Sequence, residues 1–246
     1  MVQGVPLDHR RRLLRAVTLA VACLIALGVA PAATSAAAQP YVIDLGRRSD
    51  FVPQSNFVQC VGASMQMMLN MMRPGADRSA STQRELQVLA RTWSGPRRPG
   101  RERQGASVRG WSMGLNLRGA GPYQVVGADT IGEALLMAAR AIRTTGKPVG
   151  LLMWRGRHAW VMSGFRATRD PLVRGARVTT VIVEDPLHPH GSSVWGPSPA
   201  PGAELGVKAL GRQFVPRRRS AQASSLGGKY VLVLPYEFSA RVLRTK

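Results

Sequence analysis

The pattern of apolar and polar positions changes period about halfway along this chain. The first half shows helical spacing, and its clearest segment is Cys60–Arg73, which is apolar almost all round and holds five methionines. A helix without a polar face is normally buried, so these methionines are interpreted as flexible core-filling side chains. Further helices are predicted over about 82–93, 107–117 and 130–145, and the first and last of them open on the capping boxes Thr82–Glu85 and Thr130–Glu133.

The second half shows the alternating, β-branched patterns of strands. Strands are predicted at 149–154, 158–167, 177–185 and 229–234, after a brief one at 123–126. Residues 39–59 are expected to be extended and loop-like, and 186–228 form a Pro/Gly/Ser/Arg-rich stretch with little periodicity. The Gly/Pro/Arg-rich loop over 94–105 is expected to be exposed and open to proteolytic nicking. Helices first and antiparallel strands afterwards predict an α+β domain.

The N-terminal region has the layout of an export signal. Four arginines lie between positions 10 and 15, and an uncharged apolar run follows over 16–30. That run is shorter than the roughly 20 residues that span a bilayer, and Ala36-Ala37-Ala38 suits signal peptidase. We therefore expect residues 1–38 to be a signal peptide and 39–246 to be the exported domain. An uncleaved membrane anchor and a lipoprotein modified at Cys23 are the alternatives.

The formal net charge of +21 is the most unusual feature of the composition. Cleavage after Ala38 removes four arginines and Asp8, which lowers the charge to +18. The sequence has no basic recognition helix, zinc-finger spacing or interleaved aromatic and basic residues, so specific nucleic-acid binding is not expected. The scattered arginines are interpreted first as solvated loop charge, and contact of these basic loops with anionic cell-envelope polymers is the alternative. No cofactor fingerprint is present.

Cys60 is the candidate nucleophile, because it is the one thiol left after removal of the signal and lies where a polar loop becomes a helix. A helix N-terminus favours a thiolate, which also needs a base and a group that orients the base. His158 opens one predicted strand and Asp185 ends the next. If these strands are antiparallel neighbours, Asp185 can accept from Nδ1–H of His158 while Nε2 faces Cys60. Gln54, six positions before Cys60, can donate to an oxyanion beside the Cys60 backbone N–H.

These residues together resemble a known family pattern. Q-x-x-x-x-x-C-x-G-A-S at a helix start, then G-R-H-A-W, then a strand ending D-P is similar to the papain-like cysteine peptidases, in particular the branch of the bacteriocin-processing, double-glycine-leader peptidases. The resemblance covers roughly Pro53–Pro186. It implies a helical half, with the nucleophile at a helix start, packed on a C-terminal antiparallel sheet. It also implies Cys60 as nucleophile, His158 as general base and acid, Asp185 as the orienting group and Gln54 as oxyanion donor.

Two competing motifs point to other chemistries. Gly110-Trp111-Ser112-Met113-Gly114 matches the G-x-S-x-G nucleophile elbow of serine α/β-hydrolases, but the elbow needs a buried strand before Ser112, and the preceding residues are polar. Ser112 is expected in a helix instead. His188 and His190 resemble metal ligands, yet they lie in a proline-containing loop without carboxylates, so no metal site is expected.

The prediction is therefore an exported cysteine peptidase or related amide hydrolase that acts on a peptide or protein. Its domain core is expected over about 50–190, followed by a loop-rich extension ending in a strand. Acyl transfer by the same thiol is a close alternative, since an amine can replace water. A catalytically silent papain-like binding module at the cell envelope is the alternative from a different class.

Overall fold

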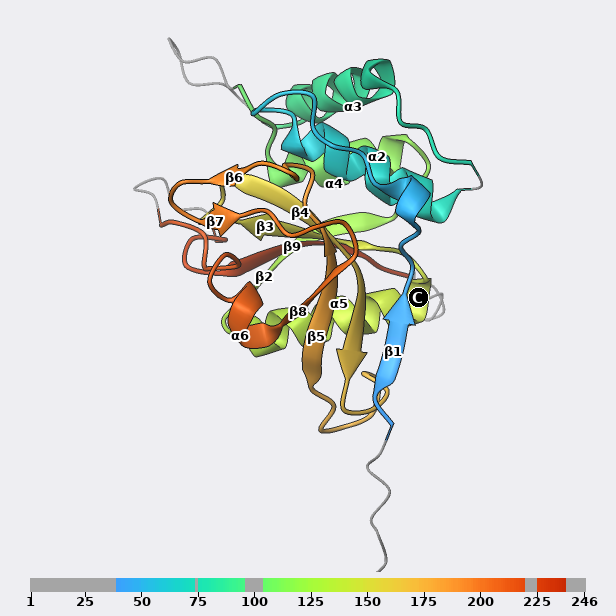
Figure 1. Cartoon of the computed structure of the whole chain (residues 1–246), viewed down its shortest axis with the longest axis vertical. Helices are drawn as coiled ribbons and strands as arrows, with labels where there is room; N and C mark the ends of the chain where they lie inside the picture. The colour runs from blue at the N-terminus through green and yellow to red at the C-terminus, as the bar shows by residue number, and fades with distance from the viewer. Residues whose placement is uncertain (1–38, 74, 96–103, 220–224, 238–246) are drawn as a thin grey trace, which may run out of the picture. The chain divides into compact units, whose positions relative to one another are not determined.

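The computed structural model describes residues 39–73, 75–95, 104–219 and 225–237, which belong to one compact unit. Residues 1–38, with the predicted signal peptide, and 96–103, with most of the predicted nicking loop, lie outside the described residues. Within the described ranges, helices and one large antiparallel sheet make up the molecule (Figure 1). The α+β prediction is confirmed. None of the helices described is both long and apolar enough to cross a membrane.

Seven of the described strands form the large sheet, in which every pairing is antiparallel. The order is β2-β9-β3-β4-β5-β8, and β1 pairs with the far half of β4. The bounds are β1 Tyr41–Asp44, β2 Tyr123–Ala128, β3 Val149–Met153, β4 His158–Ala167, β5 Val178–Glu184, β8 Ala203–Gly206 and β9 Tyr230–Pro235. A small second sheet pairs β6, Gly191–Ser192, with β7, Gly196–Pro197.

Three helices form a layer on one face of the sheet: α2 (Cys60–Met72) and α4 (Val108–Leu117) contact its strands, and α3 (Ala80–Thr92) packs on these two helices. The prediction that α2 is buried is confirmed, because every residue from Val61 to Asn70 is buried. Its methionines pack with Trp111, Leu86 and strand residues in one apolar cluster. The interpretation of these methionines as core side chains is therefore confirmed.

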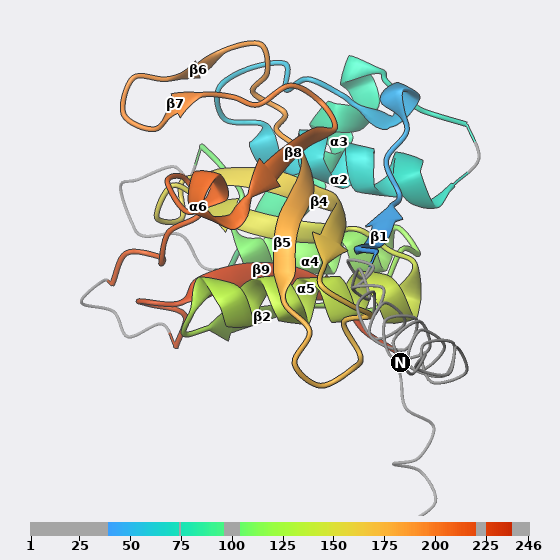
Figure 2. The ribbon, with the colours of Figure 1, turned by 60° about the horizontal axis from the view of Figure 1, so that its bottom comes forward.

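A fourth helix, α5 (Ile131–Thr145), covers the opposite face of the sheet (Figure 2). The buried small residues Ala134, Ala138 and Ala139 let it lie close to the strands, where Trp160 and Phe165 fill the core. Thr130 caps α5 by accepting from Glu133 N, as predicted. The Glu133 carboxylate, however, accepts from Asp129 N instead of closing the box on Thr130.

Several predicted boundaries are wrong. Residues 39–59 include strand β1 and the short 3-10 helix η1, Arg48–Asp50. Helix α3 begins two residues before Thr82, because the Ser79 hydroxyl accepts from Thr82 N and so takes the N-cap position. Residues 186–228 contain β8 and the single-turn α6, Val207–Leu210. These elements are short and lie at the sheet edge, where pairing with β5 supplies the order that the sequence pattern lacks.

Candidate active site

Cys60 is the first residue of α2, as predicted, and is half-buried. Two buried glutamines of α3 hold the loop that leads to it. Gln87 accepts from Gly62 N at 2.9 Å and donates to Val58 O at 2.9 Å. Gln83 accepts from Ser55 N at 2.7 Å and donates to Pro53 O at 2.9 Å. Each amide thus satisfies one donor and one acceptor, which fixes the backbone on both sides of the thiol.

The Gly62 of the Cys-Val-Gly-Ala-Ser segment has a packing role. A Cβ at this position would lie 2.7 Å from Gln83 O and 2.9 Å from Gln87 Cβ. A side chain would therefore push α2 away from α3 and break the hydrogen bonds of both glutamines. The side chain of Gln59, the N-cap residue, makes no capping hydrogen bond, so it does not occupy the helix N-terminus beside Cys60.

His158 and Asp185 meet at the end of the sheet nearest this helix start. The predicted antiparallel pairing of their strands is confirmed, with Val161 opposite Glu184 in the register. His158 Nε2 lies 2.6 Å from Asp185 Oδ1, and both side chains are buried rather than placed at an open cleft mouth. The predicted orientation of the ring is wrong, since Asp185 contacts Nε2 of His158 rather than Nδ1. The Asp185 carboxylate is fixed by Leu187 N, which donates to Oδ1 at 2.9 Å.

The charge state of His158 couples the two halves of the molecule. Burial alone lowers the pKa of His158, but hydrogen bonding and charge attraction from Asp185 and from Cys60 raise it more, to about 9. The imidazolium form is therefore favoured at neutral pH. Because Cys60 lies in the helical layer and Asp185 follows β5, groups from both halves of the molecule contribute to this raised pKa.

Trp154 is a site residue that the sequence analysis did not identify. Its ring stacks on His158 with centroids 4.1 Å apart. Two hydrogen bonds to Gln213 fix Trp154: Trp154 Nε1 donates to Gln213 Oε1 at 2.9 Å, and Trp154 N donates to Gln213 O at 3.0 Å. Trp154 and Arg155 have φ values of 56° and 57°, a conformation that costs non-glycine residues roughly 1–2 kcal/mol each. The tight Trp-Arg-Gly-Arg-His turn was the available signal, but it did not show where the indole would pack.

Gln54 lies beside the Asp185 segment, as its backbone N–H donates to Pro186 O at 2.7 Å. Its side-chain Nε2 donates to Asn56 O at 2.9 Å, within the loop that leads to Cys60. Its Oε1 is buried and has no hydrogen-bond partner among the described residues. An amide nitrogen carries two hydrogens, so one remains for a ligand. The structure places Gln54 next to the site without joining it to Cys60.

Ser112 lies inside α4, as expected, and its hydroxyl donates to Arg109 O. The strand that a nucleophile elbow needs is absent before it, because the described residues from 104 to 107 lead directly into the helix. The two motif glycines serve packing: a Cβ at Gly110 would lie 1.9 Å from Ala90 O, and one at Gly114 would lie 2.5 Å from Met65 Cε. This G-x-S-x-G sequence therefore allows close contact between helices.

His188 and His190 each lie beside an aromatic ring. His188 packs edge-on against Phe51, and His190 lies 6.2 Å from the exposed ring of Phe57, three residues before Cys60. Across the residues that the structure describes, no group of three or more His, Cys, Asp or Glu side chains could hold a metal ion.

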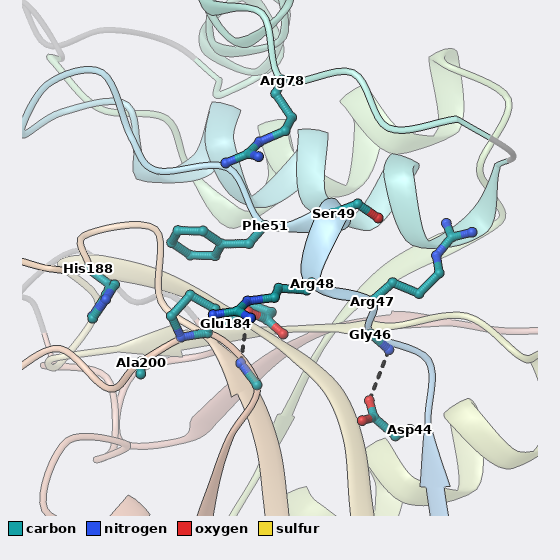
Figure 3. Close-up of a pocket in the computed structure, with 12 residues that line it drawn as sticks. Asp44, Gly46, Arg47, Arg48, Ser49, Phe51, Arg78, Glu184, His188 and Ala200 are labelled. Carbon is teal, nitrogen blue, oxygen red and sulfur yellow. Dashed lines mark hydrogen bonds between the residues drawn. The ribbon is translucent and has the colours of Figure 1, made fainter.

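A cavity of about 930 Å³ lies between the helical layer and the sheet, next to the segment that carries Asp185 (Figure 3). Arg48 and Arg78 reach into it, whereas Arg47 turns away to pair with the fully buried Asp50. Glu184 lines the floor and accepts one hydrogen bond, from Gly202 N at 3.1 Å. Burial, with smaller effects of Asp44 and Asp50, raises the pKa of Glu184 to about 7.

The structure thus arranges three of the four predicted site residues in a chain from Cys60 through His158 to Asp185. The second link is a hydrogen bond of 2.6 Å, the first is the effect of Cys60 on the pKa of His158, and Gln54 lies beside the Asp185 segment. Such a chain can generate a thiolate, hold an imidazolium next to it and transfer a proton from that imidazolium. No protein-family model matches this chain, and no curated protein matches its sequence.

Proposed function

We propose that this protein is a thiol-dependent peptidase or related amide hydrolase of papain-like fold. The observation that carries the proposal is the position of His158, buried between the Asp185 carboxylate at 2.6 Å and the thiol at the start of α2. A histidine that only filled the core would not need both a carboxylate partner and a cysteine partner. The packing of a helical layer, which bears the thiol, on an antiparallel sheet, which bears the histidine and the carboxylate, supports the papain-like assignment.

The proposed reaction has two steps. The Cys60 thiolate attacks the amide carbonyl, the carbon–nitrogen bond breaks, and the His158 imidazolium gives its proton to the departing amine. Water then attacks the thioester while neutral His158 takes a proton from it, and the acid product leaves as the thiolate is restored. An amine in place of that water gives acyl transfer.

The supporting roles follow from the contacts. Asp185 keeps His158 oriented and stabilises its charged form through Nε2. Trp154 covers one face of the ring and separates it from solvent, which strengthens that electrostatic interaction. The backbone N–H at the start of α2 and the remaining hydrogen of Gln54 Nε2 are the proposed oxyanion donors.

We also propose that the protein is exported after removal of residues 1–38 and acts on a peptide or protein outside the cytoplasm. The arginine-rich start, the short apolar run and Ala36-Ala37-Ala38 support this. N-terminal sequencing of secreted protein should then begin at or near Gln39. Recovery of Met1 in a membrane fraction would instead identify an anchor.

The activated thiol is tested by intact mass spectrometry and peptide mapping after a low dose of iodoacetamide or of the epoxysuccinyl inhibitor E-64. Cys60 should be labelled faster in the folded protein than after denaturation. His158→Ala should lose this difference while staying folded, and Cys60→Ala should abolish hydrolysis of any substrate found. Equal labelling of folded wild-type and His158→Ala protein would reject the pair and favour a catalytically silent binding module.

A further inference from the structure

A second cavity, of about 570 Å³, begins beside the catalytic histidine. Its lining residues are Trp154, Arg155, Arg157, Val194, Trp195 and Arg218. Trp154 is therefore both a wall of this cavity and the ring stacked on His158. Trp154 thus connects this cavity to the imidazole.

The walls come from three segments that are held together. Arg155 and Arg157 belong to the β3–β4 turn, whose conformation is fixed by the two hydrogen bonds from Trp154 to Gln213. Arg218 joins this turn through its backbone, because Arg218 N donates to Arg155 O at 3.2 Å. Val194 and Trp195 lie in the loop between β6 and β7. The cavity is thus built mainly on a turn that also sets the position of His158.

The charge of this cavity has one sign. Arg155, Arg157 and Arg218 are exposed, no ion pair joins any of them to another described residue, and none of the lining residues is acidic. Three guanidinium groups around one concave surface attract anions, and the planar fork of arginine matches a carboxylate in two hydrogen bonds. The two indoles and Val194 add apolar walls for the carbon skeleton of the ligand.

The position of this cavity beside Trp154 and His158 indicates which part of a substrate the cavity binds. The imidazolium must deliver its proton to the departing amine, so the leaving-group side of the scissile bond has to lie on the histidine side of the thiol. We propose that this cavity binds the leaving-group side of the substrate and selects a carboxylate there, either an acidic side chain or a free C-terminus. This assignment of substrate class rests on the function proposed above.

Binding can be measured without catalysis, in protein carrying Cys60→Ala. The probes are three dipeptides that differ only in charge: Glu-Phe amide, with an acidic side chain; Gln-Phe acid, with a free C-terminus; and Gln-Phe amide, with neither. Calorimetric titration should show at least tenfold tighter binding of one or both carboxylate-bearing probes than of the neutral amide. The probe that binds identifies the source of the carboxylate.

Removing the charges of the three lining arginines tests whether this cavity causes the preference for carboxylate. The triple variant Arg155→Gln, Arg157→Gln, Arg218→Gln should reduce the preference for carboxylate to less than twofold. The matched control is Arg169→Gln, Arg174→Gln, Arg177→Gln, which removes the same charge beyond the opposite end of β4 and should retain the preference. Thermal unfolding of both variants checks that these exposed substitutions leave the fold intact.

Two results would overturn the proposal. One is equal affinity for the charged and neutral dipeptides, and the other is an equal loss of carboxylate preference in the control variant and the cavity variant. The thiol-labelling experiment separates this failure from a failure of the proposed function. Carboxylate preference with an unactivated Cys60 would leave the cavity as an anion-binding site and reject hydrolysis. An activated Cys60 without carboxylate preference would retain the hydrolase and reject this substrate class.

Discussion

The two halves of this protein hold Cys60 and His158 by different means. In the helical half, the loop before Cys60 is fixed by neutral amides, since Gln83 and Gln87 bond only to backbone groups. In the sheet half, His158 is fixed by a charged partner and an aromatic ring, Asp185 and Trp154. The thiol is thus positioned through its backbone, and the imidazole through its side chain.

This difference predicts different consequences of substitution. Buried hydrogen bonds between neutral groups contribute to order and stability, but they leave the charge of the site unchanged. A buried carboxylate next to an imidazole changes the pKa of the ring, and with it the pH range of the chemistry. Substitutions in the sheet half should therefore alter pH dependence, whereas those at the amides of the helical half should alter stability and rate together.

The largest effect is expected at the histidine pair. His158→Ala should lose up to about 10⁴-fold in turnover, because the proposed proton-transferring group is gone. Asp185→Asn should keep a measurable fraction, since asparagine can still accept from the ring. The raised pKa of His158 keeps the ring protonated up to about pH 9, above which the proposed proton donor is lost. Removing the Asp185 charge lowers that pKa, so the alkaline limb of the rate profile should move to lower pH. An unmoved limb would contradict the assigned role of Asp185.

The next effect concerns the buried charge beside the site. The pKa of Glu184 is raised from 4.5 to about 7, so ionising this group opposes folding. The cost is absent below pH 4.5, grows between 4.5 and 7, and is complete above 7. Glu184→Gln should therefore add about 3 kcal/mol of stability at pH 8 and little at pH 4, as measured by urea unfolding.

The exposed Glu204→Gln is the matched control for Glu184→Gln, since Glu204 pairs with Arg166 at the surface and its pKa is lowered. A salt bridge of this exposure contributes little, so this variant should not gain stability at pH 8. If Glu184→Gln gains as much at pH 4 as at pH 8, ionisation of Glu184 is not the cause.

The smallest effect is expected in the helical half. Gln87→Ala leaves Gly62 N–H and Val58 C=O without their partner, which should cost about 2 kcal/mol and lower Tm by about 4–8 °C. Turnover should fall as the loop before Cys60 loses order, with no shift in the pH profile. Gln124→Ala, on an exposed position of β2, should change neither quantity. A shifted pH profile in Gln87→Ala would remove the distinction between the two halves.

Local pattern was enough for much of the fold and for the choice of candidate residues. A helix apolar on all sides has to be buried, so α2 could be predicted in the core before any partner was known. Alternating and β-branched segments gave β4 and β5, and their ends placed His158 and Asp185 near each other. The capping hydroxyl of Thr130 is equally local, because it bonds within its own first turn.

Tertiary structure decided what depends on contacts between distant segments. Strand β8 exists because β5 pairs with it. The ring orientation of His158 depends on where Asp185 and Cys60 converge, which strand order alone does not fix. The hydrogen bonds of Gln87 and of Gln213 join residues 25 or more positions apart, and Trp154 acts through a stacked ring. No periodic pattern in the sequence indicates such contacts. Sequence determined which groups the site contains, and packing determined which atoms of those groups meet.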